Sequence, residues 1–247
     1  MVQSLFRLAL SLFIFVATGA CGGTASHVTT IGPSQIGSAE KQCPFDATVT
    51  LTLLNGHKSD VVISGVYIGN GYIITDAYAP VLSAELIHAT FVRYGTNFRR
   101  SVQAVLVRSD SGIGLALIKM PAQPVCSAIL ADMRLVSAGD DAHLSILDGL
   151  NRGSIVHPYR PFSEPGHLNE VMVLSANFSD APIGSGIYAE NGALLGIRVG
   201  SSNKSSDKVI ALPASRIARF LEEYSVPYWQ YNHTQQHSGY THVSIVK

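Results

Sequence analysis

Charged residues are scarce in this sequence. They make up 14% of its 247 residues, and 17 Lys plus Arg balance 17 Asp plus Glu. A chain without net charge creates no long-range field, so electrostatic binding of nucleic acid or of an anionic membrane surface is not expected. Hydrophobic residues make up 47%, which is enough to bury a core and excludes a disordered chain. The length fits one large domain or two small ones.

Hydrophobic runs long enough to cross a membrane are also lacking. The apolar run Leu8–Val16 is too short for a spanning helix, which needs about 20 apolar residues. Arg7 precedes this run and the small residues Ala17–Ala20 follow it. This order is typical of a secretory signal peptide, here over residues 1–20. We therefore expect an exported protein.

A cysteine directly follows the predicted signal peptide. The small residues before Cys21 resemble a bacterial lipobox, in which the cysteine becomes the lipidated first residue of the mature protein. Ordinary cleavage after Ala20 is the alternative, and it would leave a free thiol. The Ser-, Thr- and Gly-rich residues 21–42 are interpreted as a linker. We expect a location in the bacterial periplasm, with membrane contact only through the lipid anchor.

Cysteine is rare, with three residues in the chain. If Cys21 carries a lipid, Cys43 and Cys126 remain as an even pair in a compartment where disulfides persist. We expect these two to be bonded. Such a bond would close a loop of about 80 residues and stabilise the fold by about 4 kcal/mol in the chain-entropy model. Two separate buried thiols are the alternative.

Short β-branched runs separated by turn residues dominate the chain. Asn55-Gly56 and Gly69-Asn70-Gly71 are typical of hairpin turns, because Gly and Asn tolerate positive φ. The stretch Pro121–Pro124 divides the runs into two sets of six, and each set is consistent with a closed antiparallel barrel. The fold class is therefore predicted as all-β, with two six-stranded barrels. The expected strands are Thr48–Leu54, Val61–Ile68, Tyr72–Thr75, His88–Tyr94, Val102–Arg108, Leu115–Met120, Ala142–Leu147, Gly153–His157, Val171–Ala176, Gly186–Ala189, Leu194–Val199 and Val209–Leu212.

One amphipathic helix is predicted after the strands. Ile217, Phe220 and Leu221 have helical spacing behind Pro213, which predicts a helix from Ala214 to about Tyr224. The folded domain would then cover residues 43–224. Residues 225–247 would form either an appended strand or a flexible tail.

Two pairs of residues, one of histidines and one of aspartates, have the side chains of metal ligands. His233 and His237 are four residues apart, a spacing that suits a metal only on a helix, and their Gln-, Ser- and Gly-rich surroundings favour a solvated tail. Asp140 and Asp141 follow Gly139 and are interpreted as turn residues rather than as a divalent-ion pair. We expect no metal and no other cofactor.

Four segments in order resemble the trypsin-like serine proteases, most closely the bacterial periplasmic Deg (HtrA) branch without its PDZ domain. The resemblance covers roughly residues 45–224. It implies the double-barrel fold, and it also implies a disulfide between the start of the domain and the inter-barrel linker, which fits Cys43 and Cys126. The segments are Ser64–Thr75, Gly114–Lys119, Gly184–Ile197 and Ile210–Ile217.

The same resemblance implies that the catalytic triad is degenerate. Tyr78 stands where the family has its histidine, and a tyrosine with an ordinary pKa near 10 cannot serve as the neutral base. Gly114 replaces the aspartate that would orient an imidazole. The ungapped match through Asn191-Gly192 places Ile183 at the nucleophile position and Ala181 at the glycine that helps form the oxyanion hole. No triad position carries its catalytic residue in this alignment.

A second alignment makes Ser185 the nucleophile, because Pro182–Gly186 also resembles the family motif. It requires a two-residue deletion in the following strand, and no motif supplies a base. His57 and His88 are nearby in sequence, but a lone His on a strand or turn is more often a packed or exposed residue. The second alignment therefore does not restore a catalytic unit.

The sequence thus predicts an exported pseudoprotease that binds a protein or an extended peptide in the cleft between its barrels, by β-augmentation and without cleavage. Two alternatives stay open. One is an active serine endopeptidase that uses Ser185 with a non-standard base. The other is a structural envelope lipoprotein whose binding surface is the tail from Ser225. The oligomeric state is not predicted.

Overall fold

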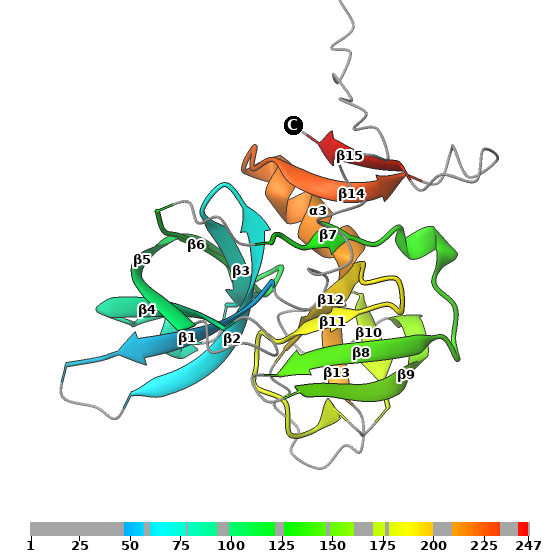
Figure 1. Cartoon of the computed structure of the whole chain (residues 1–247), viewed down its shortest axis with the longest axis horizontal. Coiled ribbons are helices and arrows are strands. Elements are labelled where there is room, and N and C mark those ends of the chain that lie inside the picture. The colour runs from blue at the N-terminus through cyan, green and yellow to red at the C-terminus, as the bar shows by residue number, and fades with distance from the viewer. Residues whose placement is uncertain are drawn as a thin grey trace, which may run out of the picture.

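The structure is a computed structural model in which two β-lobes lie side by side, with a helix and a β-hairpin at one end (Figure 1). It describes residues 47–56, 60–77, 79–92, 99–121, 126–146, 149–160, 170–175, 178–199, 209–232 and 242–246. The predicted signal peptide 1–20, the lipidation candidate Cys21, the linker 21–42 and Cys43 lie outside the described residues.

The first lobe is a closed antiparallel barrel with the strand order β1-β2-β3-β6-β5-β4. Alternation explains its inner face: in β1, Val49, Leu51 and Leu53 are fully buried and the residues between them are half-buried. A short helix, α2 (Ala79–Leu82), follows β3. The strands are β1 (Thr48–Leu54), β2 (Val61–Gly69), β3 (Tyr72–Asp76), β4 (Leu86–Val92), β5 (Arg99–Asp110) and β6 (Leu115–Lys119).

The second lobe is also a six-stranded barrel. Its strands follow the order β11-β8-β9-β10-β13-β12, and pairing of β11 with β12 closes the ring. The barrel strands are β8 (Asp141–Ile146), β9 (Gly149–Arg160), β10 (Val171–Leu174), β11 (Gly186–Tyr188), β12 (Leu194–Arg198) and β13 (Val209–Pro213). All twelve predicted barrel strands are therefore present, and the predicted all-β double-barrel class is confirmed.

The two barrels share an apolar interface. Val66, Ile74 and Leu117 belong to strands of the first barrel, yet they pack in the same buried cluster as the core of the second barrel. Strands β2, β3 and β6 are accordingly buried over almost their whole length. A strand covered on both faces carries a continuous apolar run instead of an alternating one, which explains the run from Val66 to Ile74 on either side of its glycine turn.

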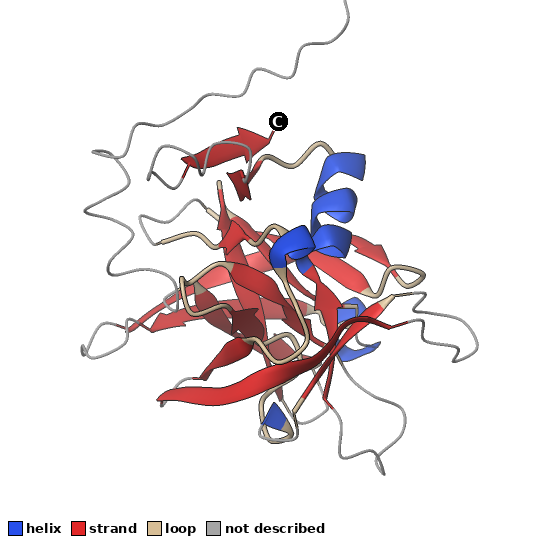
Figure 2. Cartoon of the chain, turned by 90° about the vertical axis from the view of Figure 1, so that its right-hand side faces the viewer, coloured by secondary structure: helices blue, strands red, loops and turns tan. Residues whose placement is uncertain are grey.

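The predicted helix is present as α3 (Ala214–Glu223), which lies at the end of the molecule that also holds the last strand (Figure 2). Ile217, Phe220 and Leu221 are fully buried, as the helical spacing predicted. Tyr224 follows the helix, and its ring meets that of Phe220 edge to face at 5.0 Å. None of the described helices is long and apolar enough to cross a membrane.

Strands also occur within the segment predicted as an appended strand or a tail. β14 (Tyr228–Asn232) pairs with β15 (His242–Val246) and, in parallel, with the two-residue strand β7 (Ile129–Leu130) of the inter-barrel linker. Tyr228 is buried, and its hydroxyl donates to Glu222 Oε1 at 2.7 Å. The described part of this segment is thus packed on the second barrel and its helix.

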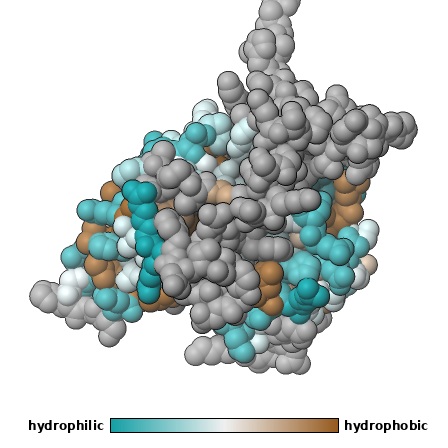
Figure 3. Space-filling model, in the orientation of Figure 1, coloured by the Kyte–Doolittle hydropathy of each residue, from teal (hydrophilic) through white to brown (hydrophobic). Residues whose placement is uncertain are grey.

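The described surface that faces the viewer in Figure 3 mixes hydrophilic and hydrophobic residues. Val62 on β2 and Val105 on β5 are the most exposed of the large apolar side chains that the structure describes. Single exposed apolar residues of this kind are normal for a folded domain and require no partner.

Candidate functional site

The position predicted for the triad acid is occupied by the backbone of Gly114. Gly114 lies in the turn between β5 and β6 with φ +83°, and its amide donates to the carbonyl of Asp110 at 2.7 Å. Its own carbonyl accepts from the amide of Ala77 at 3.0 Å. The residue after Ala77 is Tyr78, the predicted base position, which lies outside the described residues. The fold thus brings the chain next to Tyr78 against Gly114, which has no side chain to orient a base.

The predicted nucleophile loop is held against the first barrel. The carbonyl of Ile183 accepts from the amide of Ser64 on β2 at 2.8 Å. Gly184 follows with φ +82°, and a Cβ at this position would run into the carbonyl of Ser64 and the hydroxyl of Thr75. That hydroxyl already donates to the Ser64 carbonyl at 2.7 Å. Only glycine fits here, because both the backbone angle and the lack of space exclude a side chain.

The side chains at the two candidate nucleophile positions differ in exposure. Ile183 is partly exposed. Ser185 has a relative exposure of 0%, and its Oγ has no hydrogen-bond partner among the described residues. Its backbone is anchored on both sides. Its amide donates to the carbonyl of Pro182 at 3.2 Å, and its carbonyl accepts from the backbone amide of Arg198 at 2.8 Å. The loop therefore presents an apolar side chain and hides its hydroxyl.

At least one of the two backbone donors that would form an oxyanion hole already donates to a carbonyl within the protein. In the family, the amides of the nucleophile and of the residue two positions before it point at the oxyanion. If Ile183 is at the nucleophile position, the second donor is the amide of Ala181, which donates to Phe178 at 3.3 Å. If Ser185 is the nucleophile, its own amide donates to Pro182. Each alignment therefore loses at least one of its two donors.

A half-buried cation lies beside this loop. Arg198, at the end of β12, donates from Nη2 to the carbonyl of Ser179 at 3.0 Å, while its Nε is buried without a partner in the described part of the chain. Burial lowers the pKa of Arg198, and the nearby carboxylates of Asp180 and Asp76 partly oppose this effect by favouring the charged form. Arg198 is thus a charged group in the same loop region, and the sequence did not single it out.

The remaining predicted residues are not brought together with this loop. His88 is half-buried on β4, where it pairs with Thr52 and Gln103 on the neighbouring strands. His57, His233 and His237 lie outside the described residues. Among the residues that the structure describes, no group of three or more His, Cys, Asp or Glu side chains could hold a metal ion.

Only one member of the predicted disulfide can be described. Cys126 lies in the linker before β7 and is not a free thiol. Cys43 is outside the described residues, so the Cys43–Cys126 bond stays a prediction.

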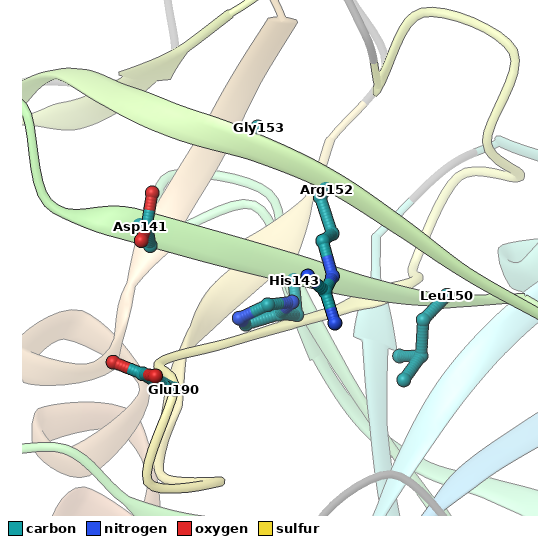
Figure 4. Close-up of a pocket in the computed structure, with 6 residues that line it drawn as sticks. All are labelled: Asp141, His143, Leu150, Arg152, Gly153 and Glu190. Atoms are coloured by element: carbon teal, nitrogen blue, oxygen red, sulfur yellow. The ribbon is translucent and has the colours of Figure 1, made fainter.

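A separate pocket of about 340 Å³ lies on β8 and β9 (Figure 4). It is lined by Asp141, His143, Leu150, Arg152, Gly153 and Glu190. Sequence reasoning missed it, because Glu190 reaches β8 only through the pairing of β11 with β8. Asp140 does serve the turn, since its Oδ2 accepts from the amide of Ser137 at 2.8 Å. Asp141, the next residue, lines the pocket.

Known proteins resemble the chain in fold rather than in sequence. No family model matches it, and no curated protein matches it significantly in sequence. The active form of the Rv3671c protease from M. tuberculosis is 15% identical, with a TM-score of 0.63 over 85% of this chain and 95% of that one. A serine-to-alanine variant of the HtrA-type protease AlgW with a tripeptide is 17% identical. Its TM-score is 0.61 over 77% of this chain and 63% of that one.

A third similar structure is the MamO protease domain from Magnetospirillum magneticum, which is 20% identical, with a TM-score of 0.57 over 72% of this chain and 96% of that domain. These neighbours are trypsin-like proteases of the HtrA type or resemble them, and the two closed barrels with a C-terminal helix match their architecture. The chain therefore has the trypsin-like serine protease fold.

Proposed function

We propose that the protein is an exported pseudoprotease that keeps the trypsin-like fold, has no peptidase activity, and binds an extended peptide or a protein segment between its barrels. The proposal rests mainly on the loop Ala181–Gly186. Its partly exposed side chain is Ile183, and its one hydroxyl, that of Ser185, is buried without a partner among the described residues.

The chemistry of peptide hydrolysis supports inactivity. A serine needs a base to take its proton, and that base needs a group that orients it. Gly114 supplies no such group, although its carbonyl contacts the amide of Ala77, which directly precedes the base position. Removal of triad members leaves only the rate enhancement due to binding and to the oxyanion hole. Here an oxyanion donor is also directed into the protein, so this residual contribution is weakened too.

Binding without cleavage is supported by the fold. The serine-to-alanine variant of the HtrA-type protease AlgW, which has this fold, has a solved structure with a tripeptide. An extended peptide gains affinity from main-chain hydrogen bonds and from side-chain contacts, and neither requires a nucleophile. The partly exposed Ile183 would offer an apolar contact where the serine of a protease meets its substrate.

The two alternatives have less support. An active peptidase would need Ser185 Oγ to reach a carbonyl carbon, and its present burial prevents this approach. A structural lipoprotein that binds through its tail would need residues after Ser225 to be available, but Tyr228 is packed against α3. Export and lipidation at Cys21 remain part of the proposal on the sequence pattern alone.

The test uses fluorescein-labelled unfolded β-casein as the probe. We expect its fluorescence anisotropy to rise on mixing with the protein, while a denaturing gel shows no fragments after prolonged incubation. Ile183→Glu would place a charge at the proposed contact and should weaken binding about tenfold or more. Val62→Glu introduces the same charge in place of an apolar side chain at an exposed position on β2 and should leave binding unchanged.

Casein fragments formed by the native protein would contradict inactivity. Equal binding by Ile183→Glu and Val62→Glu would contradict a binding site between the barrels.

A further inference from the structure

The pocket on β8 and β9 has its charges separated by sign. Asp141 and Glu190 form an acidic end, and their carboxylates lie on one side of His143 (Figure 4). Arg152 lies on the other side, with the apolar side chain of Leu150 beyond it. The side chains of Asp141, Glu190 and Arg152 are exposed, whereas those of His143 and Leu150 are half-buried.

Strand pairing produces this separation. His143 pairs directly with Arg152 on β9 and with Tyr188 on β11. Because β8 and β11 are antiparallel, the chain after Tyr188 runs alongside the start of β8, which places Glu190 at the level of Asp141. Glu190 therefore lies across from Asp141, and Arg152 lies across from His143.

This arrangement is not the one that favours fold stability. Opposite charges that face each other across neighbouring strands are stabilising, and like charges are destabilising. The register places Asp141 opposite Ser154 rather than opposite Arg152. Within the part of the chain that the structure describes, neither Asp141 nor Glu190 makes an ion pair. The two carboxylates thus remain available to a cation from outside the fold.

We propose that this pocket binds the two charged ends of a short peptide, with the ammonium group between Asp141 and Glu190 and the carboxylate at Arg152. Arginine is suited to a carboxylate, because its planar guanidinium can donate two parallel hydrogen bonds. A pair of carboxylates is suited to an ammonium group, which has three donors and no acceptor.

The spacing selects the length of the peptide. The acidic end at Asp141 and the basic end at His143 and Arg152 are two strand residues apart, which is about 7 Å. An extended dipeptide spans about the same distance, since each residue adds at most about 3.6 Å. Leu150 lies beyond the basic end, so an apolar residue is expected at the carboxyl terminus. The predicted ligand class is a dipeptide with free termini and an apolar second residue.

The probe is alanyl-leucine, with two blocked forms as controls. Acetylation of its amino group removes the charge that the acidic end would bind, and amidation of its carboxyl group removes the charge that Arg152 would bind. Isothermal titration calorimetry on the full chain should show saturable binding of alanyl-leucine. Each blocked form should bind about tenfold more weakly or worse, since a charge-assisted hydrogen bond is lost.

Variants assign each end of the peptide to its residues. Arg152→Gln should bind alanyl-leucine as weakly as the native protein binds the amide, and it should no longer distinguish acid from amide. The double variant Asp141→Asn with Glu190→Gln should likewise no longer distinguish the free from the acetylated amino group. Arg219→Gln and Glu223→Gln are matched changes at exposed positions of α3 and should leave binding unchanged.

Three results would overturn the proposal. They are an absence of saturable heat with alanyl-leucine at millimolar concentration, equal affinity for the free and the blocked dipeptides, and unchanged discrimination in the pocket variants. The blocked dipeptides are tested on the native protein, so the test does not depend on the folding of any variant. Casein binding in the α3 and pocket variants separates this site from the proposed peptide cleft, because pocket binding can fail while casein binding persists.

Discussion

The loop Ala181–Gly186 and the pocket on β8 and β9 lie at opposite ends of the same short strand, β11, and differ in how their polar groups are treated. In the loop, the polar groups are hydrogen-bonded within the protein or buried: backbone amides donate to nearby carbonyls, and the Ser185 hydroxyl is buried. In the pocket, charged groups are exposed and arranged with like beside like. At the predicted catalytic position the chain therefore keeps the scaffold with its one hydroxyl buried, whereas in the pocket the carboxylates of Asp141 and Glu190 remain exposed.

The largest expected effect comes from Gly184, which closes the loop against the first barrel. Gly184→Ala should lower the free energy of unfolding by about 3 kcal/mol or more, because a Cβ would meet the Ser64 carbonyl and φ is positive. Denaturant unfolding measures this loss. Gly139→Ala is the matched control, since φ is +94° but nothing lies within 4 Å of its Cβ. Gly139→Ala should lower the free energy of unfolding only by the backbone strain, about 1 kcal/mol. Equal losses would show that the loop is not held by the neighbouring barrel.

A smaller effect of the opposite sign is expected at Ser185. Its buried hydroxyl lacks a partner among the described residues, so Ser185→Ala should leave stability unchanged or raise it by about 1 kcal/mol. The control is Ser175→Ala, because the Ser175 hydroxyl accepts from the amide of Ser154 at 3.1 Å and its loss should destabilise the protein by a similar amount. Destabilisation by Ser185→Ala would show that the hydroxyl has a hydrogen-bond partner. The loop and the pocket would then differ less in how their polar groups are bonded.

The smallest effect concerns the acidic end of the pocket. Glu190→Gln relieves the repulsion with Asp141, so without ligand it should raise the free energy of unfolding by a few tenths of a kcal/mol at low salt. The gain should shrink as salt screens the charges. Glu223→Gln on α3 serves as the control for the loss of an exposed carboxylate. A loss of stability in Glu190→Gln would mean that the carboxylate has a structural partner.

The sequence was sufficient to predict the barrels because their signals are local. Alternation around Val49, Leu51 and Leu53 fixes the inner face of β1, and apolar spacing fixes the buried face of α3. Strands β7 and β14 could not be predicted in the same way. β7 has two residues, too few for a pattern, and β14 is held by its pairing with the linker rather than by its own alternation.

The candidate site was predictable only in part. The order of the motifs assigned Gly114 to the position of the triad acid and Ile183 to that of the nucleophile. The structure adds the hydrogen bonds that join Gly114 to Ala77 and Ile183 to Ser64. The pocket was beyond sequence reasoning, because Asp141 and Glu190 are far apart in the chain and meet only through the strand order of the second barrel. The burial of Ser185 likewise depends on packing and not on its motif.

The absence of an activated serine is tested most directly by labelling the purified protein with a fluorophosphonate probe, which reacts with activated serines. Ser185→Ala serves as the negative control, and the combined Tyr78→His, Gly114→Asp and Ile183→Ser variant serves as the restored triad. We predict no labelling of the native protein under conditions that label a trypsin-like protease. Labelling of the native protein that disappears in Ser185→Ala would contradict it.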